Sequence, residues 1–169
     1  MLIKKMDKHY DIEKIILEWN NIYRLNHWHN NNQIAIQHSG EVSYTDGCGY
    51  WSGQEENDYK FINPIFEGTI FEKIIKEFNG YNARIMLMKP KSVYSIHKDS
   101  SIRMHLAILT NLSSYFVFPE DNHVEHIPAD GHIYTVDTTK KHTVFNSDLK
   151  SDDGKLLVPS NRIHMVFSV

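Results

Sequence analysis

The clearest pattern in the first part of the chain is an apolar stripe at helical spacing behind a polar cap residue. Apolar side chains recur at i, i+3, i+4 and i+7 after Asp11, namely Ile12, Ile15, Ile16 and Trp19. This spacing predicts a short amphipathic helix, because positions three and four apart share one helical face. The Asp11 carboxylate can accept hydrogen bonds from the free N–H groups of the first turn, so we expect the helix to begin there.

A second helix is predicted over residues 70–79. Its apolar stripe consists of Ile70, Phe71, Ile74, Ile75 and Phe78. Thr69 and Glu72 have the spacing of a capping box, in which each side chain bonds the backbone N–H group of the other residue. Gly80 follows directly, and we expect it to adopt the left-handed conformation that commonly ends a helix.

After Ala83 the pattern changes to short apolar runs separated by turn residues. The runs, which we expect to be β-strands, cover residues 83–88, 94–97, 103–109, 115–118, 132–137, 142–146 and 163–169. A further strand is expected at Gln33–Gln37, and the glycine-containing stretch from Tyr44 to Gly53 is expected to be a loop. Short strands that follow helices favour a mainly β fold with N-terminal helices, either a sandwich or a cupin-like jelly roll.

Composition favours one soluble domain. With 169 residues, of which 41% are hydrophobic, the chain can bury one sizeable core, and we expect a helical part in residues 1–80 and a β core in residues 81–169. The net charge of −3 argues against nucleic acid as a partner, since binding to a phosphate backbone needs a basic surface. No apolar run approaches the roughly 18 residues of a membrane span. Because Cys48 is the sole cysteine, a reducing compartment is expected, and we predict a cytoplasmic protein with no membrane partner.

The most informative residues for function are His97 and Asp99, in the sequence Tyr-Ser-Ile-His-Lys-Asp. Residues two apart on a strand leave from the same side, so this imidazole and this carboxylate can bind one metal ion together. Local geometry supplies no third ligand, and His142, which opens an apolar strand after a polar turn, is the natural candidate. Two imidazoles and one carboxylate on one face of a metal ion are the arrangement of non-haem Fe(II) oxygenases.

Arginine and histidine alternate on two of the expected strands, as Arg103-Met-His105 and as Arg162-Ile-His164. The two polar residues of each pair share a face, opposite apolar neighbours. A single His-x-Asp, or a single arginine on a strand, is more often a surface feature. The doubled Arg-x-His pattern favours a cavity that takes an anion, because arginine offers two parallel donors to a carboxylate.

Two other groups of residues have simpler explanations. The segment His123-Val-Glu-His126 superficially resembles a zinc hydrolase site, but prolines precede and follow it, which favours a polar hairpin. The aromatic residues between Tyr44 and Trp51 could line a substrate cleft or pack over the barrel, and the sequence leaves both open.

Several motifs occur in a fixed order in the second half of the chain. They are Arg84-Ile-Met-Leu-Met-Lys-Pro, His97-Lys-Asp99, Arg103-Met-His105-Leu-Ala-Ile-Leu-Thr-Asn111, Gly131 to Asp137, His142-Thr-Val-Phe-Asn146 and Arg162-Ile-His-Met-Val. In this order they resemble the aspartyl/asparaginyl β-hydroxylase family of Fe(II)- and 2-oxoglutarate-dependent oxygenases. Residues 33–37 and the loop through Gly53 resemble small members of the same family more weakly.

The resemblance implies a double-stranded β-helix in which His97, Asp99 and His142 bind Fe(II). The implied activity is that of a dioxygenase with 2-oxoglutarate as co-substrate and O2 as oxidant, which releases succinate and CO2. Its substrate would be a small molecule or a peptide, hydroxylated at a C–H bond of an amino acid or of a side chain such as Asp or Asn. A cupin-type module that binds metal without catalysis is the alternative.

The resemblance also implies how the co-substrate is held. Arg162 would bind the distal carboxylate of 2-oxoglutarate, while Arg103 and His105 would lie near its other polar end. An insertion from Asp148 to Asn161 lengthens the connection that leads to Arg162. Two lysines of this insertion, Lys150 and Lys155, are alternative anchors.

Overall fold

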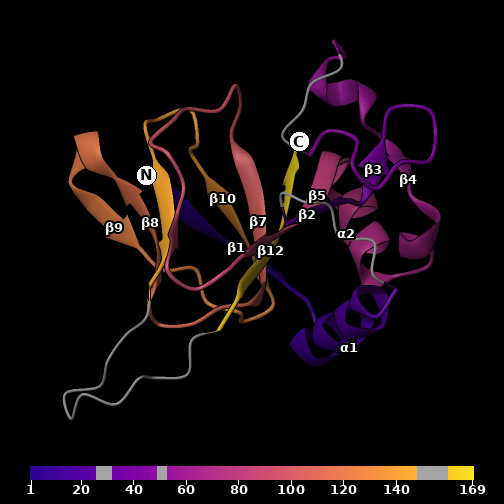
Figure 1. Ribbon diagram of the computed structural model, residues 1–169, viewed down its shortest axis with the longest axis horizontal. Coiled ribbons are helices and arrows are strands. Elements are labelled where there is room, and N and C mark those ends of the chain that lie inside the picture. Colours follow the sequence, from indigo (N-terminus) through magenta and orange to yellow (C-terminus); the bar gives the residue numbers. More distant parts are fainter. Residues whose placement is uncertain (26–31, 49–52, 148–159) are drawn as a thin grey trace.

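The computed structural model describes residues 1–25, 32–48, 53–147 and 160–169. Within these ranges the fold is mainly β, with two α-helices and antiparallel sheets (Figure 1). The helices are α1 (Ile12–Tyr23) and α2 (Ile70–Phe78), with the short 3-10 helices η1 (Glu56–Asp58), η2 (Pro64–Phe66) and η3 (Pro119–Asp121). The strands are β1 (Ile3–His9), β2 (Gln33–Ala35), β3 (Gln37–His38), β4 (Phe61–Ile62), β5 (Tyr81–Met88), β6 (Ser92–Val93), β7 (Arg103–Leu109), β8 (Ser114–Phe118), β9 (His123–Glu125), β10 (His132–Val136), β11 (Thr143–Asn146) and β12 (Arg162–Ser168).

The strands form two main sheets. The larger sheet has the order β1-β10-β7-β12-β5-β2 and the smaller has the order β6-β11-β8-β9, while β3 pairs with β4. From β5 onward the chain passes back and forth between them, with β5, β7, β10 and β12 in the larger sheet and β6, β8, β9 and β11 in the smaller. Strands far apart in the sequence, such as β5 and β12, therefore lie side by side (Figure 1).

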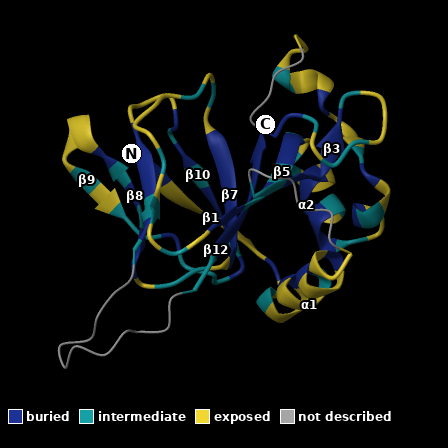
Figure 2. Cartoon of the chain, viewed as in Figure 1, coloured by how far each residue is buried: buried dark blue, intermediate teal, exposed yellow. Residues whose placement is uncertain are grey.

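Hydrophobic residues pack on both faces of the larger sheet. One core lies between this sheet and the helices, and it includes Trp19 of α1, Phe71 of α2 and Leu106 of β7. The other core lies between the two sheets and includes Phe116 and Phe118 of β8. Figure 2 shows the central strands of the larger sheet as buried, whereas much of α1 faces solvent.

The two faces of β7 differ in chemistry. Met104, Leu106 and Ile108 belong to the core on the helix side, whereas Arg103 and His105 face a cavity between the sheets. This is the alternation that the sequence predicts, and β12 repeats it. On β12, Ile163 and Met165 pack on the helix side and Arg162 lines the cavity. Both arginines therefore lie inside the sandwich.

The helix starts agree with the sequence, but one helix end does not. The Asp11 side chain accepts hydrogen bonds from two N–H groups of α1, and the Thr69 side chain accepts one from the Glu72 N–H. The left-handed residue after α2 is Asn79, with φ 51° and ψ 38°, so the prediction of Gly80 was wrong. Asparagine tolerates this conformation because its short side chain is polar.

Gly80 has a different role in the fold. A Cβ atom at this position would lie 2.6 Å from a ring carbon of Phe167. Glycine is therefore needed here for the close approach of β12 and not for an unusual backbone conformation.

The N-terminal region contributes one strand that the sequence analysis missed, β1, and the strand expected at residues 33–37, which the structure divides into β2 and β3. Residues 3–9 form β1, an edge strand that pairs with β10, and β2 forms the opposite edge of the larger sheet. Most residues of β1 are exposed. In the described residues before position 81, α1 and α2 are the only α-helices, and this part supplies both edge strands of the larger sheet.

Two further segments can be compared with their predictions. The strand expected at 94–97 is shorter and earlier, at Ser92–Val93, although Tyr94 and His97 still make backbone hydrogen bonds to the segment 142–144. The polar hairpin predicted around His123-Val-Glu-His126 is present as the antiparallel pair β8–β9. No helix in the described part of the chain has the length and apolar character needed to cross a membrane.

Candidate metal centre

The backbone places His97 and His142 directly opposite each other. His97 follows β6 and His142 precedes β11, and the two residues form an isolated antiparallel bridge. The His97 N–H donates to the His142 carbonyl at 3.0 Å, and the His142 N–H donates to the His97 carbonyl at 2.9 Å. Side chains directly opposite in an antiparallel pair leave on the same face. The centroids of the two imidazole rings are accordingly 4.5 Å apart.

Hydrogen bonds to backbone carbonyls determine which ring nitrogen of each histidine is free. His97 Nδ1 lies 2.7 Å from the Ser95 carbonyl oxygen, and His142 Nδ1 lies 3.0 Å from the Lys140 carbonyl oxygen. A carbonyl oxygen only accepts, so each Nδ1 carries the proton and donates it. Both Nε2 atoms keep a lone pair for a metal ion. Burial lowers the pKa of His142, which favours the neutral, metal-binding form of this imidazole.

Asp99 supplies the carboxylate of the group. Its N–H donates to the Thr138 carbonyl at 2.8 Å, and the Thr138 hydroxyl donates to the Ser101 carbonyl at 2.6 Å. These bonds tie the Asp99 loop to the turn that precedes His142. Asp99 Oδ1 lies 3.7 Å from His97 Nε2, and one ligand atom from each of the three predicted residues lies within 4.8 Å of the others. The structure thus brings together all three residues that the sequence proposes as metal ligands.

A cavity of about 70 Å³ extends from these residues into the space between the two sheets. Apolar side chains, among them Phe116 and Val144, form part of its wall. Three arginines also line it: Arg84 from β5, Arg103 from β7 and Arg162 from β12. Arginine side chains are rarely this buried unless they are paired, so their partners decide what the cavity can hold.

Arg162 is buried, and no acidic residue within the described ranges pairs with it. It is 3% exposed, its guanidinium carbon lies 5.1 Å from the centroid of the Phe116 ring, and its Nη2 donates to His164 Nδ1 at 3.1 Å. Among the described residues, no carboxylate lies within ion-pair distance of this side chain. Burial lowers the pKa of Arg162 to about 10, so the side chain is still charged at pH 7. The arginine expected to bind the co-substrate therefore carries into the cavity a charge that no described carboxylate balances.

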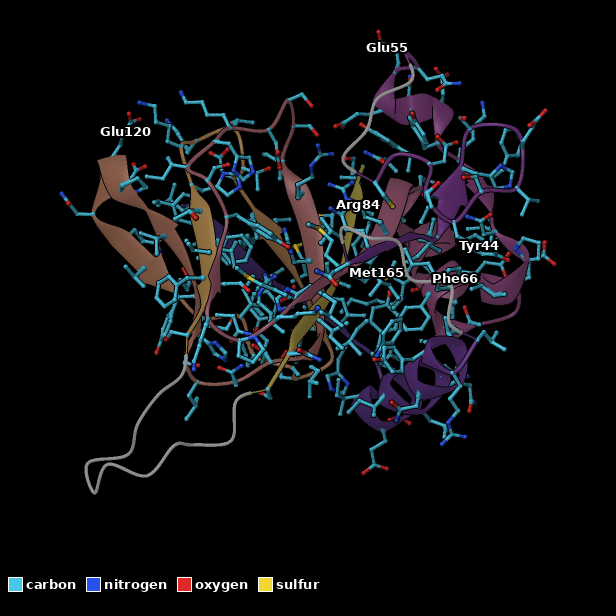
Figure 3. All side chains as sticks on the ribbon, viewed as in Figure 1. Tyr44, Glu55, Phe66, Arg84, Glu120 and Met165 are labelled. Atoms are coloured by element: carbon cyan, nitrogen blue, oxygen red, sulfur yellow. The ribbon has the colours of Figure 1, made fainter. Side chains whose placement is uncertain are left out.

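Arg84 is a second buried cation of this kind, and the sequence analysis gave it no role. Its Nη1 donates to the Asn82 carbonyl at 3.3 Å, but its Nε has no hydrogen-bond partner within the described ranges. Burial, followed by the charge of Arg103, lowers the pKa of Arg84. Figure 3 shows Arg84 in the body of the fold, at the larger sheet. Arg84 stands beside the apolar Ile85 on a strand that the sequence predicts, and this alternation could have indicated that Arg84 faces the cavity.

Arg103 lines the same cavity, but its guanidinium group is already engaged. Nη1 donates to Glu56 Oε2 at 2.8 Å, Nη2 donates to Glu56 Oε1, and Nε donates to Asp99 Oδ2 at 3.4 Å. The Ser168 hydroxyl accepts a further bond from Nη1. Only Arg84 and Arg162, of the three arginines, retain guanidinium charge with no carboxylate at ion-pair distance among the described residues.

The two buried histidines beside these arginines are neutral. Burial, followed by the charge of Arg162, lowers the pKa values of His105 and His164 well below the usual 6.5. His105 Nδ1 and His164 Nε2 have no hydrogen-bond partner among the described residues. His105 lines the cavity as expected, and its free nitrogen is available to a ligand.

A second hollow lies on the outer side of Asp99. This groove of about 390 Å³ is lined by Gln54, Glu55, Glu56, Lys98, Asp99, Ser100 and Arg103. Asp99 and Arg103 thus line both the inner cavity and the outer groove. All the residues lining the groove are polar or charged, so it suits a polar ligand.

Some predictions concern residues outside the described ranges. They include the aromatic residues Tyr50 and Trp51 and the alternative anchors Lys150 and Lys155. The described part of the predicted loop, Tyr44–Cys48, contains turns and bends without helix or strand.

Comparison with known proteins does not assign a family or a function to this chain. No family model matches the chain, and no curated protein matches it. The case for a function therefore depends on the residues of the site.

Proposed function

We propose that this protein is an Fe(II)- and 2-oxoglutarate-dependent dioxygenase that hydroxylates a C–H bond of an amino acid, a peptide or a protein side chain. The observation that carries the proposal is that a His-Asp-His group lines one cavity together with two buried arginines that have no carboxylate partner in the described part of the chain. A metal site alone would support many functions. A metal site that shares its cavity with unbalanced positive charge calls for an anionic co-substrate.

The donor set supports iron as the metal. His97 and His142 offer neutral Nε2 atoms and Asp99 offers a carboxylate oxygen, which are the donors of the Fe(II) facial arrangement with open positions. These three residues would hold the ion at the mouth of the cavity. Bound Fe(II) would activate O2, and 2-oxoglutarate would be oxidised to succinate and CO2 while one oxygen atom enters the substrate.

The buried arginines support a dicarboxylate as co-substrate. Burying a guanidinium group without a counter-charge costs several kcal/mol, and an anion in the cavity would offset that cost. Arg162 would bind the distal carboxylate through its two parallel donors, on the wall of Phe116 and Val144. Arg84 and the free Nδ1 of His105 would complete the polar lining. The apolar part of the wall excludes water from these contacts.

The fold agrees with this proposal. Apart from the β8–β9 hairpin, strands β5 to β12 alternate between the two sheets, which supports a jelly roll, or double-stranded β-helix, as the proposed architecture. In that architecture a metal site lies at the open end of the sandwich, and His97 and His142 are found at strand ends of the smaller sheet. The outer groove beside Asp99 would receive the substrate, and its polar lining favours an amino acid or peptide over a lipid.

The test is an anaerobic titration of the purified protein with Fe(II) and then with 2-oxoglutarate. A keto acid chelated to Fe(II) produces a visible charge-transfer band, which we expect in the wild type and expect to be absent in Asp99→Ala and His142→Ala. His123→Ala is the matched control, because His123 pairs with Glu125 on the β8–β9 hairpin. Tight metal binding without a band would favour a non-catalytic cupin-type module. No metal binding would overturn the proposal.

A further inference from the structure

Glu56 binds Arg103 from a distant part of the sequence. It belongs to η1, and 47 residues separate it from Arg103 along the chain. Both of its carboxylate oxygens accept from the guanidinium group. The hydroxyls of Ser100 and Ser101 each donate to it at 3.1 Å, and the Ser168 hydroxyl donates at 3.3 Å.

The ion pair is sheltered from water. The Arg103 side chain is 4% exposed and the Glu56 side chain is 16% exposed. Burial by itself raises the pKa of Glu56, but its hydrogen bonds and ion pair with Arg103 outweigh this and lower the pKa to about 2. Glu56 is therefore ionised throughout the physiological range, and Arg103 always has a carboxylate on its two terminal nitrogens.

The third nitrogen of the Arg103 guanidinium group, Nε, points toward the candidate metal centre. Its Nε donates to Asp99 Oδ2 at 3.4 Å, while Asp99 Oδ1 is the oxygen that lies 3.7 Å from His97 Nε2. One carboxylate oxygen of Asp99 is thus held by arginine and the other faces the histidines. A single Asp99 oxygen would meet the metal ion, which leaves more positions open for other ligands.

Without Glu56, the same arginine would compete for Asp99. A guanidinium group with free terminal nitrogens forms its strongest pair with a carboxylate through two parallel hydrogen bonds. Arg103 would then take both oxygens of Asp99 and draw the carboxylate away from the histidines. Glu56 prevents this because it occupies the terminal nitrogens.

We propose that Glu56 is a positioning residue for Asp99. Glu56 acts through Arg103, and it keeps one carboxylate oxygen of Asp99 directed at the metal ion. The inference rests on the proposed metal centre, and it adds a residue that touches neither the metal nor the co-substrate. It also explains why Arg103 is not available as a co-substrate anchor. Glu56 lines the outer groove as well, so one side chain supports both the metal ligand and the wall of the groove.

The experiment measures Co(II) binding by its visible absorption in anaerobic titrations, with no co-substrate and no turnover. Co(II) accepts the same imidazole and carboxylate donors as Fe(II) and has a spectrum sensitive to ligand geometry. We expect Glu56→Gln to weaken Co(II) binding by about 10-fold or more, as removal of outer-shell partners commonly does. Glu56→Asp, which keeps the charge, should bind with intermediate affinity. Glu41→Gln is the matched control, because Glu41 is exposed and lines neither the cavity nor the outer groove.

A double variant tests the route through Arg103. In an Arg103→Met background no guanidinium competes for Asp99, so adding Glu56→Gln should change Co(II) affinity by less than about twofold. This double variant removes both charges of the Glu56–Arg103 pair, so neither is left buried without its partner. It therefore also serves if Glu56→Gln alone does not fold, which a thermal melt would reveal.

Each outcome decides something different. Wild-type affinity in folded Glu56→Gln would overturn the positioning role and leave the metal centre intact. An equal loss from Glu56→Gln in both Arg103 backgrounds would overturn the route through Arg103. Absence of Co(II) binding in the wild type, or its persistence in Asp99→Ala, would overturn the metal centre itself and the inference with it.

Discussion

His97 and His142 exchange both of their backbone hydrogen bonds across one isolated bridge, so the main chain places their two imidazoles side by side. Backbone pairing alone is enough to bring the two rings together, with little contribution from neighbouring side chains. Their Nδ1 atoms are also bonded to main-chain carbonyls, of Ser95 and Lys140. The centre is therefore preorganised by backbone geometry, and changes to its side chains should affect metal binding more than folding.

The first prediction contrasts the two histidines. His97→Ala and His142→Ala should each abolish measurable Fe(II) binding. The His97 side chain is 41% exposed, so its removal should change the free energy of unfolding by less than about 0.5 kcal/mol. His142 is 3% exposed and lies near Phe116 and Phe118, so its removal should cost about 1–3 kcal/mol. Denaturant unfolding of the metal-free variants measures both changes in the free energy of unfolding. If the two variants lost equal stability, the prediction from their different burial would be wrong.

The second prediction concerns Arg162. Arg162→Ala should weaken 2-oxoglutarate binding by about 30-fold or more, since truncation of a buried charge pair costs 2–5 kcal/mol. Arg162→Lys should remain weak because lysine restores the charge without the two parallel donors. Titration of the charge-transfer band at fixed Fe(II) gives the affinity, and Arg24→Ala, at an exposed arginine, is the control. An unchanged affinity would mean that another cation holds the distal carboxylate.

The third prediction concerns Arg84, whose charge is buried without a carboxylate partner in the described part of the chain. Arg84→Met replaces this charge by an apolar side chain and should stabilise the protein without co-substrate by about 1–3 kcal/mol. This would raise the melting temperature by several degrees. The further rise that 2-oxoglutarate causes in the wild type should shrink in the variant. A lower melting temperature without co-substrate would show that Arg84 is already satisfied.

The fourth prediction concerns the pH dependence of the Glu56–Arg103 pair. The pKa of Glu56 falls from 4.5 to about 2 on folding, so the unfolded chain binds a proton there before the folded chain does. The stabilisation by this carboxylate is therefore complete above pH 4.5 and is lost as the pH falls toward 2. At pH 7 the free energy of unfolding of the wild type should exceed that of Glu56→Gln by about 2 kcal/mol. Urea unfolding of both proteins at several pH values measures this difference. If Glu56 had a purely steric role, the difference would not change with pH.

Local patterns allowed much of the fold to be predicted. The alternation of Arg103 and His105 with apolar neighbours placed them correctly on the inner face of β7, because a half-buried strand has a period of two. The apolar stripe behind Asp11 identified α1 for the equivalent reason. His97 and Asp99 could be paired from their spacing alone, and His142 was chosen for its position at a strand start.

Other features depend on partners that local patterns do not contain. Residues 3–9 are mostly charged, and as an edge strand β1 buries only Ile3 and part of Met6, which is too few residues to produce an apolar alternation. Glu56 pairs with Arg103 across 47 positions of the sequence, and nothing in its sequence neighbourhood distinguishes it from the acidic residues beside it. Asn79 and Gly80 were interchanged because both residue types suit a helix end, and Phe167, which selects glycine, is distant in sequence.

The position of β12 also has a consequence for how the protein is made. Residues 162–168 leave the ribosome after β5 and β7, yet they form the strand between these two. Until they arrive, β5 and β7 each present an open edge, which is a template for association with other chains. Arg162 enters the cavity in the same step that joins these edges. The nascent chain thus acquires the arginine of the proposed anion site only when its sheet closes.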